Sequence, residues 1–296
     1  MKGLKNSRIL VAILLMAGSL FAQENANEQK QGKKVENYHG TRIINGHSVE
    51  TLEKQELEFR VEHRFGDIAG ANGGTQTFFG FDNSADIRLA FEYGITDDLM
   101  IGFGRSKGTN APYRSLLDGF VKWKFIQQRE AGMPVSMAVL GTATFTYMTA
   151  SDDITNLTHF PKTSHRFAYA TQVNVSRKFG DWLSLSLLPT ITHRNYVNHD
   201  DLNTMFSMGS AAKIKVTKKT ALLLEYYHNF HSADFRADNQ NSLALAFEWK
   251  TFGHDFTINL TNSRGFGETQ FIPYTYSNWL DGEFRLGFSI SRSFYL

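Results

Sequence analysis

Cysteine is absent from the 296 residues of the chain. The protein therefore has no disulfide framework, no thiolate nucleophile and no cysteine-based metal site. A strong charge of either sign is absent too, because 31 Lys and Arg oppose 29 Asp and Glu, for a formal net charge of +2. Nothing in this balance favours a nucleic acid as a partner.

Long apolar runs are also missing after residue 22, where none approaches the roughly 18 residues of a transmembrane helix. A mostly polar sequence would suit a soluble protein. It does not exclude a transmembrane β-barrel, because the strands of such a barrel are apolar on one face only.

The N-terminus has the parts of a secretory signal peptide. MKGLKNSR is basic, the following 13 residues ILVAILLMAGSLF are apolar, and Ala22 comes next. The apolar run is too short to cross a bilayer as a helix. We predict a signal peptide over residues 1–22, with a buried N-terminal helix as the alternative. Cleavage removes three basic residues and no acidic one, so the formal charge falls from +2 to −1.

Residues 23–54 are predicted to form a periplasmic N-terminal leader. Residues 23–40 are polar and aperiodic, which indicates a flexible segment. Residues 41–54, TRIINGHSVETLEK, contain one apolar patch at Ile43 and Ile44. This second part is compatible with a short strand, a turn, or a segment tucked into the protein.

From residue 55 to the C-terminus, apolar and polar residues alternate in short blocks. In LEFRVEHRF (57–65) the apolar side chains alternate with Glu58, Arg60, Glu62 and Arg64. Similar blocks recur up to the C-terminus, about twelve in all. A period of two residues is the signature of a β-strand.

The links between these blocks alternate in length. Five are short, near residues 94–98, 128–134, 179–181, 217–220 and 251–255. The others are longer. Short periplasmic turns and long outer loops are typical of barrels in the outer membrane. The fold prediction is therefore an all-β, transmembrane, antiparallel up-and-down β-barrel of about 12 strands over residues 55–296, with both termini on the periplasmic side. A soluble β-sandwich is the alternative.

Aromatic residues lie beside the predicted short turns, as in the girdle that meets a membrane interface. They are Tyr93, Phe125, Phe179, Trp182, Trp249, Phe252 and Phe256. Two other residues fit the pattern poorly. Pro189 interrupts a strand, so we expect a bulge or the end of the membrane span there. Arg292 falls on the outward face, and we expect it either to reach the periplasmic interface or to be turned inward by a bulge.

The C-terminal residues FRLGFSISRSFYL (284–296) resemble the last strand of outer-membrane barrels, with Leu296 in place of the usual Phe. TRIINGHSVET (41–51), LEFRVEHRFG (57–66) and ADIRLAFEYGITDDLMIGFGRS (85–106) look like a family of Bacteroidota outer-membrane β-barrels of unknown function. The resemblance implies the barrel fold and a location in the outer membrane of a Gram-negative cell. It implies outer-membrane lipid and the barrel-assembly machinery as partners, and no activity.

The inward-facing charges are the main candidate site. The predicted lumen-lining residues are Glu58, Arg60, Glu62, Arg64, Asp86, Arg88, Glu92, Lys122, Lys124, Lys213, Lys215, Glu248 and Arg285. Two interpretations stay open. The charges could line a narrow channel for small polar or anionic solutes, or they could pair across strands and fill a closed structural or docking barrel. Mixed signs on the first two strands favour pairing, whereas the fourth and eighth strands show only Lys.

An enzyme is a third and weaker interpretation. A lipid hydrolase would need a serine and a histidine near the outer rim, where His193, His228 and His231 lie, but no serine sits in a recognisable nucleophile motif. The loop 228–241 contains spaced His and Asp that could hold a divalent ion, although such residues are more often solvated. The glycine-rich residues 70–83 lack the strand-to-helix setting of a phosphate loop, so we expect a mobile outer loop. We therefore predict no catalytic residue, no metal and no cofactor.

Overall fold

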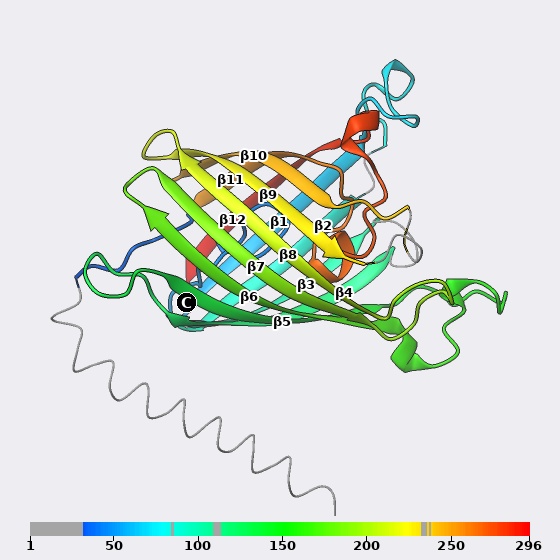
Figure 1. Ribbon diagram of the computed structural model, residues 1–296, viewed down its shortest axis with the longest axis horizontal. Coiled ribbons are helices and arrows are strands. Elements are labelled where there is room, and N and C mark those ends of the chain that lie inside the picture. Colours follow the sequence, from blue (N-terminus) through cyan, green and yellow to red (C-terminus); the bar gives the residue numbers. More distant parts are fainter. Residues whose placement is uncertain (1–31, 84–85, 109–113, 232–235, 237) are drawn as a thin grey trace, which may run out of the picture.

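The computed structural model describes residues 32–83, 86–108, 114–231, 236 and 238–296. Within these residues, twelve antiparallel strands follow one another around a closed barrel, and the last strand pairs with the first (Figure 1). The predicted fold class is confirmed. The strands are β1 (Glu56–Asp67), β2 (Asp86–Thr96), β3 (Leu99–Lys107), β4 (Ser115–Ile126), β5 (Ser136–Thr146), β6 (Phe167–Phe179), β7 (Leu183–Arg194), β8 (Thr204–Lys215), β9 (Thr220–Phe230), β10 (Ser242–Thr251), β11 (His254–Thr261) and β12 (Arg285–Tyr295). The predicted signal peptide lies outside the described residues.

The helical elements are short and lie in the connections. They are η2 (Thr75–Thr77), η3 (Leu157–His159), η4 (Thr163–Arg166), α2 (Glu268–Phe271) and η5 (Trp279–Asp281). None of the helices in the described part of the chain is long and apolar enough to cross a membrane.

The alternation of the sequence becomes the two faces of the wall. In the β1–β2 ladder, Val61 pairs with Leu89 and the next pair is Glu62 with Arg88. Leu89 is 40 % exposed, whereas Arg88 is 1 % exposed. Apolar side chains therefore cover the outside, where a membrane barrel meets lipid, and charged ones face the lumen. On the outside, the Phe59 and Phe91 rings pack with their centroids 4.9 Å apart.

Short and long connections gather at opposite ends of the barrel (Figure 1). The tight turns include Gly180 and Gly253, with φ of 58° and 82°, a left-handed backbone that favours glycine. Exposed aromatics lie at this short-turn end, among them Trp182, Trp249 and Phe252, as an interfacial girdle requires.

Pro189 and Arg292 both keep the strict alternation. Pro189 stays on the outward face of β7 with no shift of register, and the β6–β7 ladder is interrupted between the Gln172–Thr190 and Val175–Leu187 pairs. The expected bulge is therefore wrong, because an interrupted ladder accommodates the missing N–H. That the membrane span ends near Pro189 stays a prediction. Arg292 is exposed near the C-terminus, and its guanidinium lies 5.1 Å from the centre of the Phe294 ring.

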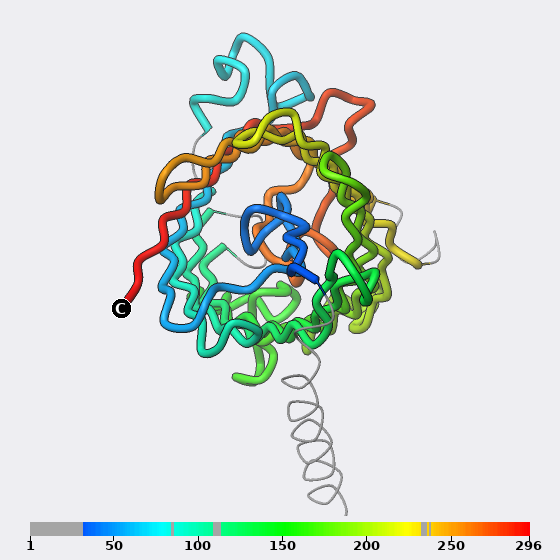
Figure 2. The backbone as a smooth tube through the Cα atoms, turned by 90° about the vertical axis from the view of Figure 1, so that its left-hand side faces the viewer, coloured from blue at the N-terminus to red at the C-terminus, as the bar shows by residue number. Residues whose placement is uncertain are grey.

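The interior of the barrel is occupied. Figure 2, a view along the barrel, shows the N-terminal segment curled inside the ring of strands, together with part of the β11–β12 connection. We call residues 33–52 the N-terminal plug and residues 262–275 the inner loop. Residues 41–49 of the plug are all buried. Of the alternatives that the sequence leaves open for 41–54, the structure shows a turn tucked into the lumen.

Candidate functional site

The N-terminal plug forms a tight turn inside the barrel. Ile43 N–H donates to Gly46 O at 2.9 Å, and Ser48 N–H donates to Thr41 O at 3.0 Å. Gly46 lies against β9, where a Cβ atom would come within 2.3 Å of Tyr227 Oη. Tyr227 is fully buried and its hydroxyl accepts a hydrogen bond from Gln172. Only glycine therefore lets the turn approach the wall this closely.

Glu225, a buried residue of β9, accepts three backbone N–H groups of the plug turn. Ile44 N and Gly46 N each lie 3.1 Å from Oε2, and Asn45 N lies 3.1 Å from Oε1. Successive N–H groups that converge in this way form an anion-binding nest. The carboxylate of Glu225 is thus the main anchor of the turn.

Other strands hold the plug by its carbonyl groups. Lys122 Nζ donates to Thr41 O at 3.0 Å and to Ser48 O at 3.3 Å. Asn174 Nδ2 donates to His47 O at 2.8 Å, and Ser184 Oγ donates to Asn37 O at 2.7 Å. Side chains from β4, β6, β7 and β9 therefore bind the plug mainly through its backbone. This binding satisfies polar groups that burial would otherwise leave unpaired.

The inner loop meets the plug from the opposite end of the lumen. His47 N–H donates to Glu268 Oε1 of α2 at 3.2 Å. Arg64 donates to Ser263 O at 3.1 Å, and also to Gly265 O and Asn45 Oδ1. Burial holds the pKa of His47 well below its usual range, and the nearby Arg42 and Lys122 act in the same direction. Burial also raises the pKa of Glu268. Burial and the two cations both favour the neutral form of the His47 ring.

Apolar contacts complete the filling of the lumen. The buried residues of this cluster come from the plug, the inner loop and the walls of β7 to β10, and include Tyr38, Ile43, Ile44, Leu188, Leu223, Tyr227, Phe271 and Ile272. Tyr227 and Phe271 pack edge to face with ring centroids 4.9 Å apart. These contacts bury the side chains of Ile43 and Ile44 in the plug turn.

Ion pairs join the charged wall residues to each other and to the plug. Arg88 Nη1 lies 2.5 Å from Glu62 Oε2, and Arg88 Nη2 lies 2.7 Å from Asp118 Oδ2. Arg60 Nη2 lies 2.6 Å from Glu58 Oε1. A second group surrounds Glu92, whose Oε1 lies 3.7 Å from Arg42 Nη2 of the plug and 3.9 Å from Arg60 Nε.

The structure places all the predicted lumen-lining residues on the inward face. All are buried except Lys124 and Lys215, which are half-buried. The pairing expected across the first two strands occurs between Glu62 and Arg88 and between Arg60 and Glu92, but two of the acidic residues also have partners outside these strands. Asp86 pairs with Arg264 of the inner loop at 2.8 Å, while Glu92 turns to the plug.

The expectation that the fourth strand shows only Lys is wrong. Asp118 of β4 has the same parity as Lys122, and it pairs with Arg88. Asp118 lies four residues before Lys122, so the same alternation places it on the inward face once the strand begins at Ser115. In β8, Lys213 Nζ lies 3.8 Å from Glu248 Oε2 of β10. Lys122 and Lys124 of β4 thus contact the plug, and Lys213 of β8 contacts the wall at β10.

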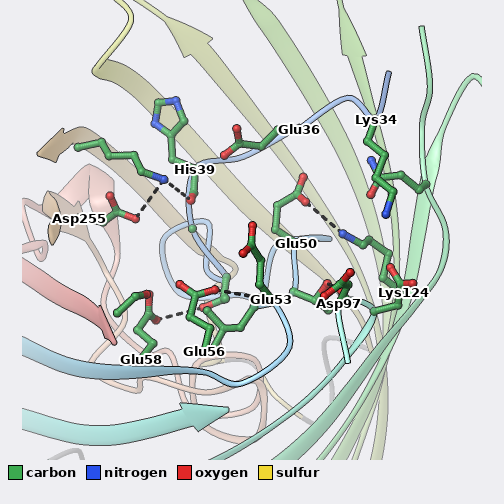
Figure 3. A pocket seen from close by; sticks show the side chains of 18 of the residues that line it. Lys34, Glu36, His39, Glu50, Glu53, Glu56, Glu58, Asp97, Lys124 and Asp255 are labelled. Atoms are coloured by element: carbon green, nitrogen blue, oxygen red, sulfur yellow. Dashed lines mark hydrogen bonds and ion pairs between the residues drawn. The ribbon is translucent and has the colours of Figure 1, made fainter. Parts of the chain in front are cut away.

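A cavity opens at the short-turn end, beside the plug. It has a volume of about 650 Å³, and plug residues His39, Gly40 and Thr41 form part of its lining. Figure 3 shows Glu50 directed toward Lys124, with Oε2 and Nζ 3.6 Å apart. The acidic residues of the lining are Glu36, Glu50, Glu53, Glu56, Glu58, Asp97, Asp98 and Asp255. The cavity is a vestibule that ends at the plug.

The residues considered for hydrolysis or metal binding lie elsewhere. His193 and His228 are exposed on the outward face, and Nδ1 of His193 lies 2.8 Å from Thr204 Oγ1. Part of the 228–241 loop, including Asp234, lies outside the described residues. Among the residues that the structure describes, no group of three or more His, Asp or Glu is arranged to hold a metal ion.

The sequence from residue 38 to residue 294 matches the family described as "Membrane bound beta barrel domain (DUF5777)". The chain belongs to this family. The match covers residues 38–52 of the plug and all twelve strands except Tyr295 at the end of β12, so most of the plug and the barrel belong to one family domain. The family description agrees with the apolar outer face. A Bacteroidota origin stays a prediction.

The chain is similar, at low sequence identity and with TM-scores below 0.5, to two solved structures. The KdgM porin is 8 % identical with a TM-score of 0.47, and the similarity covers 81 % of this chain and 99 % of that chain. The COG4313 outer membrane channel from Pseudomonas putida F1 is 16 % identical with a TM-score of 0.47, covering 83 % and 98 %. Neither similarity assigns a solute to this chain. The comparison with curated proteins found no match.

The close approach at Gly46 gives a first prediction. Gly46→Val should expel the turn from the lumen, because the added side chain would overlap the buried Tyr227, and overpacking of this kind costs about 1–3 kcal/mol. Protease added at the short-turn end should then cleave the N-terminal segment of the folded barrel. Gly267→Ala is the matched control, since nothing lies within 4 Å of its added Cβ. Equal protection of both variants would contradict the geometry.

Proposed function

We propose that this chain is an outer-membrane β-barrel that acts as a gated channel for small polar solutes, with the N-terminal plug as its gate. The observation that carries the proposal is a charged lumen wall bonded to a segment that is not one of the barrel strands. The plug continues directly into β1, and its other end forms backbone hydrogen bonds with the β4–β5 turn, from Val35 N–H to Gln128 O and from Glu130 N–H to Lys33 O. Its displacement would break these bonds but would leave the twelve-stranded ladder intact.

The polarity of the wall supports an open state. A buried ion pair stabilises a closed interior weakly, and apolar residues of similar size often do so better. A wall that faces water in part of its cycle needs its charges. The contacts between Glu225, Lys122 and the plug backbone are hydrogen bonds of a kind that water or a polar solute can replace.

The preference for anions is not part of this proposal. On β1 and β2, Glu58 balances the charge of Arg60, and Glu62 balances that of Arg88. Asp118 adds a further negative charge to the same face. We therefore propose passage of small polar solutes with little selectivity for the sign of their charge.

The rival function is a closed structural or docking barrel without transport. The apolar cluster between the plug and the walls favours it, because that cluster gives the plug a stable seat. The two functions make opposite predictions about the barrel once the plug is gone.

The test is the single-channel current of a variant that lacks residues 33–50, compared with the full chain. In a planar bilayer the variant should show frequent discrete conductance steps, whereas the full chain should show rare ones. A heat-dependent shift in gel mobility establishes that each sample is folded. A folded variant without steps would remove the channel and leave the closed barrel.

A further inference from the structure

Three phenylalanine rings are exposed on the β1–β2 connection, beyond the end of the barrel wall. Phe78 is 64 % exposed, Phe79 47 % and Phe81 43 %. We call residues 68–83 the aromatic loop. From its position and its contacts we infer that the aromatic loop docks onto the acyl chains of the surrounding lipid and anchors this end of the barrel in the membrane.

The backbone of the loop holds the rings in this exposed arrangement. Phe78 and Phe79 have left-handed φ angles of 47° and 54°, which residues other than glycine rarely adopt. Hydrogen bonds fix the conformation: Phe79 N–H donates to Gly74 O at 2.7 Å, and Gly66 N–H donates to Gly80 O at 2.9 Å. A conformation that is unfavourable for Phe and yet closely bonded is found where function requires it.

The rings continue the lipid-facing surface of the wall. Phe288 of β12 stacks on His63 of β1 with centroids 5.3 Å apart, and it lies 6.4 Å from Phe65. Phe65 lies 4.8 Å from Phe81, which in turn lies 5.8 Å from Phe78. One row of aromatic rings therefore runs from the outer face of the strands onto the loop.

The position of the loop suits lipid. In Figure 2 the aromatic loop projects outside the ring of strands, and Figure 1 shows it at the long-loop end. The aromatic loop contacts the β11–β12 connection, since Ile68 N–H donates to Phe284 O at 2.8 Å. That connection carries a further exposed apolar side chain, Leu280, which is 93 % exposed.

The composition of the loop also favours acyl chains over a polar partner. The single charged residue of 68–83 is Asp82. A segment with so little charge loses little hydration when its rings enter the acyl region. The row of rings starts on the part of the wall that faces lipid. The rings of the loop are therefore expected to contact the same lipid.

The test places a tryptophan at position 78 of the full chain. Phe78→Trp and the control Ile154→Trp, on another loop and 75 % exposed, are reconstituted in phosphatidylcholine vesicles with or without bromine on the acyl chains. The emission of the four native Trp residues is subtracted by use of the unmodified protein. Brominated lipid should remove about half or more of the emission that Phe78→Trp adds, and little of that added by Ile154→Trp.

Two results would overturn the inference. Emission at position 78 that iodide quenches from the water as strongly as at position 154 would place the ring in solvent. Emission that neither bromine nor iodide quenches would mean that protein, such as a second copy of the chain, covers the loop. Both results are independent of whether the lumen conducts.

Discussion

Replacing Arg88 with Met is expected to lower the free energy of unfolding by about 3–5 kcal/mol. Arg88 is 1 % exposed and binds Glu62 and Asp118 at the same time. Its removal leaves the buried carboxylate of Glu62 and the half-buried carboxylate of Asp118 without their cation. The expected loss is large because an unpaired buried charge costs much more than an intact pair contributes.

Urea-induced unfolding in lipid vesicles measures this effect, with Arg292→Met as the control for a lost surface charge. A second variant separates pairing from packing. Arg88→Met combined with Glu62→Gln and Asp118→Asn carries no unpaired charge, so it should recover most of the lost free energy. A loss below about 1 kcal/mol for Arg88→Met alone, the size typical of exposed pairs, would show that these groups are not buried as described.

Glu225→Ala is expected to release the N-terminal plug while the barrel stays folded. The substitution leaves the N–H groups of Ile44, Asn45 and Gly46 without their acceptor. Each unsatisfied buried group costs about 1–3 kcal/mol, less where water can enter. We therefore expect the seated state to lose about 2–4 kcal/mol, which corresponds to a roughly 30- to 700-fold change in the equilibrium between seated and displaced plug.

The rate at which protease cleaves the N-terminal segment of the folded barrel reports this equilibrium, and it should rise by a similar factor. Glu225→Gln is the graded control, because its amide keeps one acceptor oxygen and should have a smaller effect. Equal cleavage rates for Glu225→Ala and the unmodified protein would mean that the nest does not hold the plug.

The sequence predicted the wall of the barrel well, for a simple physical reason. A strand exposes alternate residues to opposite faces, so LEFRVEHRF shows by itself that Glu62 and Arg64 share a face. Alternating loop lengths then gave the direction of each strand. These signals are local, and they do not depend on distant residues.

The filling of the lumen could not be predicted in the same way. The turn at Gly46 has no period, and its anchors Lys122 and Glu225 lie far along the chain. Some ion-pair partners of the wall residues lie in segments that have no strand periodicity, so the sequence does not indicate them. Arg264 of the inner loop, which pairs with Asp86, is one example. The sequence did mark 41–54 as a segment that could be tucked into the protein, since Ile43 and Ile44 are apolar, but it did not indicate where.

The central claim is that the N-terminal plug closes the lumen, and adding the plug back tests it most directly. The measurement is the single-channel current of the barrel lacking residues 33–50, before and after a synthetic peptide of those residues is added on the short-turn side. We predict that the conductance steps cease with this peptide and persist with a peptide carrying Gly46→Val. Steps that continue unchanged in the presence of the native peptide would contradict the account.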